Sequence, residues 1–107
     1  MDVCSHIFSY IYLSNIVKRI MALVEKKVWP EYFQEIVNNN KNFELRLADF
    51  PCNSGDTLFL REWDPKTREY TGRTLKKEVT YVLKTKDINF WNKEDIKKYG
   101  FQIISFK

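Results

Sequence analysis

The spacing of apolar and polar residues predicts a strand followed by a helix near the start of the chain. Residues 22–28 are rich in strand-forming side chains, and Pro30 suits the first position of a helix. The three asparagines at 38–40 predict the end of that helix, because asparagine accepts a left-handed backbone more readily than most residues. The apolar stripe of the predicted helix consists of Tyr32, Phe33, Ile36 and Val37.

The rest of the chain reads mostly as short strands separated by turn signals. Pro51 and Ser54-Gly55-Asp56 mark a loop over 49–56, and residues 64–67 form a turn that opens a hairpin. Asn92 and Gly100 bound a short predicted helix. The further strands are expected at 42–47, 57–63, 73–83 and 101–106. This order predicts an α+β fold, a small β-barrel with one helix after the first strand.

The first twenty residues are harder to interpret. Their apolar positions suit a helix face in part, but the segment is rich in β-branched and aromatic residues, which are poor helix formers. We therefore divide the chain into an N-terminal extension over 1–20 and a domain over 21–107. The extension is either an added helix, which packs on the domain or on a protein partner, or a segment upstream of the true start.

A cluster of charged residues follows the predicted helix. If the strand at 42–47 turns its apolar side chains inward, alternation places Glu44 and Arg46 on the opposite face, and Lys41 stands at the entrance to the strand. A lysine, a glutamate and an arginine would then meet at one helix-to-strand corner, an arrangement suited to an anionic ligand such as a nucleotide. The alternative is a pair of solvated charges that contribute little to stability. The inward set would be Phe43, Leu45 and Leu47.

The composition indicates a single folded domain with an uneven distribution of charge. The chain has 107 residues, 44% hydrophobic and 16% aromatic, which favours one folded domain over disorder. Its net charge of +4 is uneven: residues 21–83 hold ten basic and ten acidic side chains, whereas 84–107 hold six lysines and three acids. That basic end suits weak attraction to nucleic acid, or is simply a solvated surface.

Cysteine, histidine and hydropathy patterns exclude several other classes. Cys4 and Cys52 lack metal-site spacing and have only His6 near one of them, so we expect reduced thiols and no metal or other cofactor. There is no secretory signal pattern and no apolar run of about 18 residues. We therefore expect a cytoplasmic protein that does not insert into a membrane.

The Lys41-x-x-Glu44-x-Arg46 motif, together with five further motifs in order along the chain, resembles the ASCH domains of the PUA-like superfamily, most closely a branch of small bacterial and phage proteins. The resemblance covers residues 22–107. ASCH domains carry a G-x-K-x-x-E-x-R signature, whose charged positions match Lys41, Glu44 and Arg46, while Asn39 replaces the glycine. The other matching motifs are Trp29-Pro30-Glu31-Tyr32-Phe33, Gly55-Asp56-x-Leu58, Leu60-Arg61-Glu62-Trp63-Asp64, Tyr70-Thr71-Gly72-Arg73 and Val79-x-Tyr81-Val82-Leu83.

The resemblance implies a PUA-like fold and a role with RNA or nucleosides. One small ASCH type hydrolyses acetylated cytidine with a lysine and a threonine, but Glu44 takes the threonine position here and cannot supply a hydroxyl nucleophile. Relatives often have a histidine before the Pro-Glu-Tyr-Phe motif, and residues 24–28 contain none. A metal-independent hydrolase acting on RNA or a modified nucleoside would have to use Glu44 as a base and Lys41 to stabilise charge.

A binding role requires less of Lys41, Glu44 and Arg46 than a catalytic role does. Arg46 offers two parallel donors to a phosphate or a base edge, and Lys41 adds a point charge. On the strand at 57–63, Arg61 and Trp63 share a face, and Trp63 or Tyr70 could stack on a base. Packing in the core is the alternative that we favour for Trp63. The sequence thus predicts an RNA- or nucleotide-binding module, with hydrolase and protein-interaction roles as alternatives.

Overall fold

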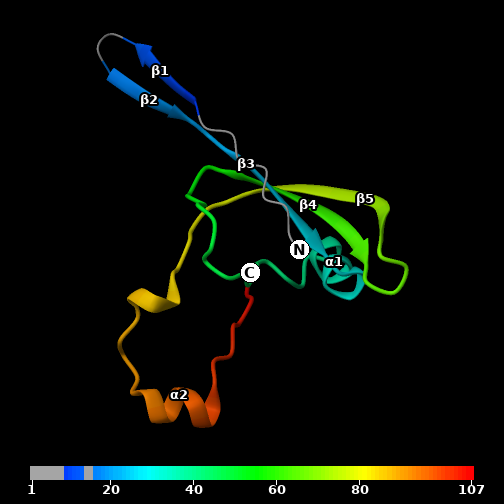
Figure 1. Ribbon diagram of the computed structural model, residues 1–107, viewed down its shortest axis with the longest axis vertical. Coiled ribbons are helices and arrows are strands. Elements are labelled where there is room, and N and C mark those ends of the chain that lie inside the picture. Colours follow the sequence, from blue (N-terminus) through cyan, green and yellow to red (C-terminus); the bar gives the residue numbers. More distant parts are fainter. Residues whose placement is uncertain (1–8, 14–15) are drawn as a thin grey trace.

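The computed structural model describes residues 9–13 and 16–107, with side chains from Met21 onward. Two strands, β1 (Ser9–Leu13) and β2 (Ile16–Ile20), pair antiparallel, and this hairpin extends beyond one end of the main sheet (Figure 1). The helix considered for the N-terminal extension is therefore wrong over 9–13 and 16–20. The abundance of β-branched residues there outweighs the partly helical spacing. His6 and Cys4 lie outside the described residues.

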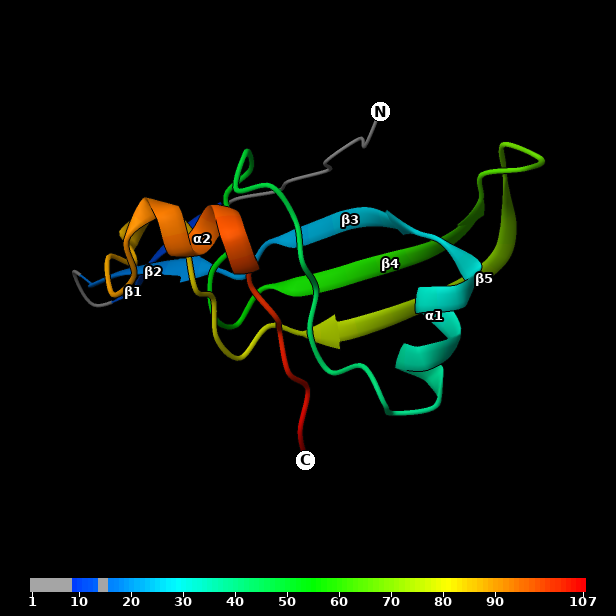
Figure 2. The same ribbon diagram turned by 90° about the horizontal axis from the view of Figure 1, so that it is seen from below.

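The main sheet is mixed and has three strands in the order β3-β4-β5. β3 (Leu23–Val28) lies parallel to β4 (Thr57–Asp64), and β4 pairs antiparallel with β5 (Glu69–Glu78). Figure 2 shows the three strands side by side, with α1 (Pro30–Val37) at one end. The α+β class is confirmed.

The sheet is open among the described residues. The segments at 42–47, 79–83 and 101–106 were expected to be strands, but all three are irregular. After β5 the chain continues through the short 3-10 turn η1 (Thr85–Asp87) and α2 (Lys93–Tyr99), which stands away from the sheet (Figure 1). The sequence located α2 correctly: the Asn92 side chain accepts from the Asp95 amide at 2.8 Å, and Gly100 ends the helix with φ +66°.

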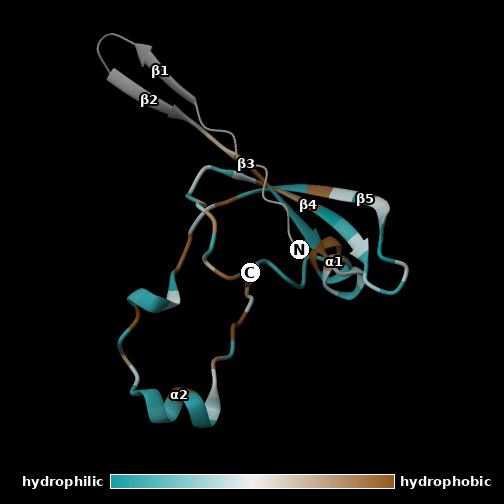
Figure 3. Cartoon of the chain, in the orientation of Figure 1, coloured by the Kyte–Doolittle hydropathy of each residue, from teal (hydrophilic) through white to brown (hydrophobic). Residues whose placement is uncertain are grey.

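Helix α1 covers one face of the sheet and forms the apolar core. Phe33 and Ile36 are buried against Val28 and Leu60. In Figure 3, hydrophobic colours gather where α1 meets the sheet and recur along the irregular chain after β5. Only half of the predicted apolar stripe is buried, because Tyr32 and Val37 are 51% and 46% exposed. Tyr32 was expected in the core, and this expectation is wrong.

A buried aspartate joins the start of β3 to the loop before β4. The Asp56 side chain is fully buried, and its two carboxylate oxygens accept from the amides of Ala22 at 3.1 Å and Asn53 at 2.8 Å. The Asp56 carbonyl also accepts from the Val79 amide at 2.8 Å. These bonds hold together the ends of β3, β4 and β5, and they fix the sheet on which the candidate site is built.

Candidate functional site

The end of α1 directs the chain back toward the sheet and positions Lys41. Asn39 adopts the left-handed conformation, with φ +63°, as the asparagine run predicted. The Glu35 carbonyl accepts from the amides of Asn40 at 2.9 Å and Lys41 at 3.1 Å. Lys41 therefore begins the irregular segment at a fixed place beside the helix, despite the absence of the strand that was expected to hold it.

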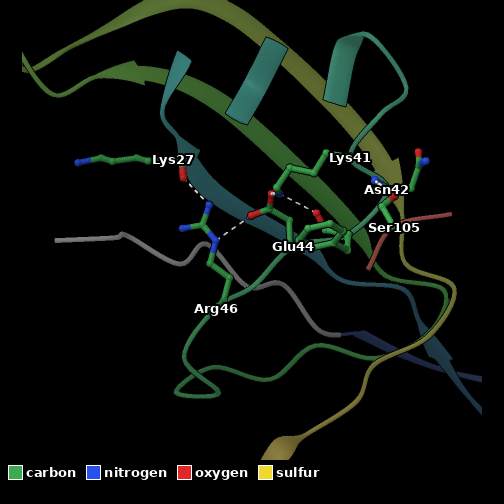
Figure 4. Close-up of polar contacts among 7 residues, drawn as sticks. Lys27, Lys41, Asn42, Glu44, Arg46 and Ser105 are labelled. Atoms are coloured by element: carbon green, nitrogen blue, oxygen red, sulfur yellow. Dashed lines mark hydrogen bonds and ion pairs between the residues drawn. The ribbon is translucent and has the colours of Figure 1, made fainter. Parts of the chain in front are cut away.

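Glu44 lies between two cations. The Lys41 ammonium lies 2.7 Å from Glu44 Oε1, and Arg46 Nε lies 2.9 Å from Glu44 Oε2 (Figure 4). The side chains of Lys41, Glu44 and Arg46 are only 16%, 13% and 22% exposed, respectively. Both ion pairs are therefore partly shielded from solvent. The predicted meeting of these three residues is confirmed, and the alternative of separately solvated charges is wrong.

Backbone carbonyls hold the two cations from their other sides. The Lys41 ammonium donates to the Phe43 carbonyl at 2.7 Å, and Arg46 Nη2 donates to the carbonyl of Lys27 on β3. Arg46 thereby connects the irregular segment to the sheet, whereas the Lys27 side chain extends away from the cluster (Figure 4). Within the described chain, the two bonds of Lys41 use two of its three ammonium protons, which leaves one for a ligand.

The exposure of residues 44–47 is the reverse of the predicted one, whereas Phe43 is half-buried and Asn42 is exposed, as expected. Leu45 and Leu47 are 67% and 80% exposed, whereas Glu44 and Arg46 are mostly covered. The cause is that the charged side chains find partners on β3 and at the helix end, which apolar alternation along a strand does not anticipate. The contact of the Asn42 amide with Ser105 Oγ, at 3.0 Å, ties this segment to the C-terminal end and was also missed (Figure 4).

The cluster forms the wall between two cavities, both lined by Lys41, Phe43, Glu44 and Arg46. The smaller cavity has a volume of about 380 Å³ and borders the apolar core, where Leu58, Leu60 and half-buried Cys52 line it. The larger, of about 840 Å³, lies toward α1. The remaining residues that line the larger cavity are Lys27, Val28, Trp29, Tyr32, Glu35, Asn40, Leu45 and Trp63.

Aromatic side chains border the larger cavity beside the cations. Trp29 is 47% exposed and Tyr32 51% exposed, and both line the cavity together with half-buried Trp63. Sequence reasoning missed Trp29 and Tyr32 as site residues. Trp29 is the N-cap residue of α1 and Tyr32 lies in its first turn, and the predicted apolar stripe wrongly included Tyr32.

Arg61 and Tyr70 were expected near the ligand but lie outside both cavities. The Arg61 guanidinium sits 3.6 Å from the centre of the Tyr70 ring, and Arg61 Nη1 lies 3.3 Å from Glu25 Oε1. The Lys27 ammonium connects this pair to the cavity, because it stands 4.7 Å from the Trp63 ring and 5.8 Å from the Tyr70 ring.

A second charged network fixes α1 to β5. The buried Glu62 carboxylate accepts from Arg73 Nη2 at 2.7 Å, Arg73 Nε at 3.0 Å and the Thr71 hydroxyl at 2.5 Å. Arg73 also donates to Gln34 Oε1 on α1 at 3.1 Å. The hydrogen bond from Arg73 lowers the pKa of Glu62 against the opposing effect of burial, and the same bond raises the pKa of Arg73. This network is structural: it sets the position of the helix that carries Tyr32 and that Trp29 precedes.

Neither a metal-binding cluster nor a membrane-spanning helix is found among the described residues. There, no three histidine, cysteine, aspartate or glutamate side chains come together to hold a metal ion. No helix in this part of the chain has the length and apolar character that crossing a membrane requires.

Comparisons with known proteins identify a family and leave its activity open. The chain is 33% identical over 67 residues to the "uncharacterized 12.9 kDa protein in GpA 3'region" of Escherichia phage P2. That alignment covers 63% of the chain and 57% of the phage protein, so the chain spans little more than half of that relative's length. No solved structure matches the chain. The model of the family described as a domain of unknown function, DUF3850, matches residues 24–95, and the chain belongs to this family.

Proposed function

We propose that this protein binds RNA or a nucleotide-like ligand in the larger cavity, beside Lys41, Glu44 and Arg46. The observation that carries the proposal is the combination of fixed cations and exposed aromatic rings around one hollow. Phosphate needs cationic hydrogen-bond donors, and an unpaired base needs a flat apolar surface. Lys41 and Arg46 meet the first need, and Trp29 and Tyr32 meet the second.

The charge of the lining suits a singly charged group such as a phosphodiester. Lys27, Lys41 and Arg46 contribute three positive charges, and Glu35 and Glu44 contribute two negative ones, so the lining carries a net charge of +1. Glu44 orients the two cations that contact it and limits their repulsion. Exposed Glu35 can accept from an amino group on a base.

The resemblance to ASCH domains supports the same assignment. Its charged signature corresponds to the three residues that meet in the structure. A PUA-like barrel, in which the irregular segments at 42–47 and 101–106 lie against each other beside the open sheet, forms part of this proposal. The Asn42–Ser105 hydrogen bond is consistent with it, because it already brings these two segments together.

A metal-independent ribonuclease or amidohydrolase has weaker support from the geometry. Such an enzyme would need Glu44 to take up a proton from water or from a ribose hydroxyl. Both carboxylate oxygens of Glu44 already accept a hydrogen bond, one from Lys41 and one from Arg46, so the carboxylate is held by the cluster and is not directed at a water or a ribose hydroxyl. If hydrolysis does occur, product from RNA or acetylated nucleosides must disappear in Glu44→Gln.

Titration of a labelled short single-stranded RNA, followed by fluorescence anisotropy at several salt concentrations, tests the proposal. We expect affinity to fall with salt, and Arg46→Ala to weaken binding by about 10- to 100-fold. Arg46→Lys keeps the charge and loses the paired donors, so it should give an intermediate affinity. Lys97→Ala, on exposed α2, is the charge-matched control and should bind nearly as the wild type does. Absence of binding at low salt, or equal losses in Arg46→Ala and Lys97→Ala, would refute the proposal.

A further inference from the structure

The sheet face opposite α1 carries aromatic rings and cations in close contact. Phe59, Arg61 and Trp63 alternate along β4, on the side away from half-buried Leu58 and buried Leu60 and Glu62. The cation–ring pairs on this face are Arg61 over Tyr70 at 3.6 Å, Lys27 over Trp63 at 4.7 Å and Lys76 over Phe59 at 5.7 Å.

Strand pairing brings these residues onto one surface. Lys27 of β3 stands opposite Arg61, and on the other side of β4 Phe59 faces Lys76 while Trp63 faces Tyr70. The face remains accessible: Tyr70 is 38% exposed and Lys76 is exposed. Cross-strand pairs of this kind do stabilise sheets. Three aromatic rings on one solvated face are nevertheless more than the stability of the sheet requires.

The face is continuous with the larger cavity. Lys27 and Trp63 belong to both, because they line the cavity and form a cation–ring pair on the sheet. From Trp63 to Phe59 the strand covers about 13 Å, room for a few nucleotides. At the far end Glu78 stands opposite Thr57, and within the face Glu25 of β3 stands opposite Phe59 and pairs with Arg61 at 3.3 Å, so one acidic side chain lies among the cations.

Each cation–ring pair provides a stacking surface for a base and a positive charge for a phosphate. A base can stack on a ring, while the cation beside that ring turns to the neighbouring phosphate. The planar guanidinium of Arg61 lies against Tyr70, and its Nη1 pairs with Glu25 at 3.3 Å, which leaves its other donors for a phosphate. A duplex keeps its bases stacked inside, so the arrangement suits single strands.

We propose that this face, defined by Lys27, Phe59, Arg61, Trp63, Tyr70 and Lys76, binds single-stranded nucleic acid that continues out of the larger cavity. The inference rests on the proposed function, and extends it from a pocket for one or two nucleotides to a track for a longer strand.

A length series of labelled single-stranded RNA, from a dinucleotide to a dodecamer, tests the track. We expect the dodecamer to bind at least 10-fold more tightly than the dinucleotide. Tyr70→Ala and Arg61→Gln should each weaken dodecamer binding about 5- to 100-fold and leave dinucleotide binding nearly unchanged. Arg46→Ala should weaken both. Lys97→Ala is the control, and circular dichroism with thermal melting confirms that each variant folds.

The possible outcomes separate the track from the pocket. Arg46-dependent dinucleotide binding without any gain in affinity with length would overturn the track and leave the pocket intact. Failure of every RNA to bind would overturn both. Photo-crosslinking of a thiouridine-containing dodecamer to the wild-type protein gives a second measurement that needs no variant. Crosslinks to Phe59, Trp63 or Tyr70 support the track, and crosslinks confined to residues 84–107 overturn it.

Discussion

Replacing Glu44 with glutamine should destabilise the protein and at the same time strengthen its binding of anions. The substitution keeps the size of the side chain but removes the negative charge between Lys41 and Arg46. Since both cations contact oxygens of one carboxylate, their charges lie about 6 Å apart, and at an effective dielectric constant of about 20 their repulsion is about 3 kcal/mol. In the wild type the attraction of both cations to Glu44 offsets this repulsion, and glutamine cannot replace that attraction. Lys41 can relax by turning outward, so we expect a loss of about 2 kcal/mol in the free energy of unfolding.

Urea denaturation followed by tryptophan fluorescence measures this loss, with exposed Glu69→Gln as the control of equal charge change. Phosphate or a mononucleotide should then stabilise Glu44→Gln more than the wild type, because the unneutralised cations bind anions more tightly and ligand binding to the folded state adds stability. If Glu44→Gln is as stable as Glu69→Gln and gains nothing from phosphate, the three residues do not act as one electrostatic unit and the reasoning is refuted.

Three further substitutions test the structure that holds the site. Asp56→Ala should lower the free energy of unfolding, measured by urea denaturation, by about 3 kcal/mol, because it removes two charge-assisted hydrogen bonds of a buried carboxylate. The control Asp49→Ala, at an exposed position, should lower it by less than about 0.5 kcal/mol. Gly55→Ala should lower the melting temperature, since residue 55 has φ +91° and a Cβ there would lie 2.6 Å from Met21 Sδ; an unchanged melting temperature would show that this turn can shift. The lowered pKa of Glu62 stabilises the fold above the ordinary value of 4.5, and this contribution is lost as pH falls through the lowered pKa. Glu62→Gln should therefore be less stable than the wild type at pH 7, with a difference that shrinks toward pH 3; a difference independent of pH would contradict this account.

Local signals in the sequence predicted the regular elements well. Strands β3 and β4 and helices α1 and α2 lie close to their expected positions, whereas β5 spans 69–78 in place of the expected 73–83, and β1 and β2 were not expected as strands. The reason is that proline at a helix start, asparagine and glycine at helix ends and alternation along a strand act over a few residues. The meeting of Lys41, Glu44 and Arg46 was predicted for a similar reason, because all three lie in one stretch of six residues shortly after the end of the helix.

Features that depend on distant partners were not predicted. Alternation at 42–47 suggested inward leucines, but Arg46 binds the Lys27 carbonyl, 19 residues earlier in the chain, and Leu45 and Leu47 turn outward. Residues 101–106 are apolar enough for a strand, yet the structure gives them no strand partner among the described residues. Pairing of this kind depends on tertiary contacts that single-sequence patterns do not encode.

An NMR titration of the isotope-labelled protein with a ribonucleotide tests the central claim most directly. The account predicts that shift changes concentrate at the amides of Lys41, Glu44 and Arg46 and at the indole N–H of Trp29, while the amides of α2 stay unchanged. Changes confined to the lysine-rich residues 84–107, or no changes at all at a saturating concentration of nucleotide, would contradict it.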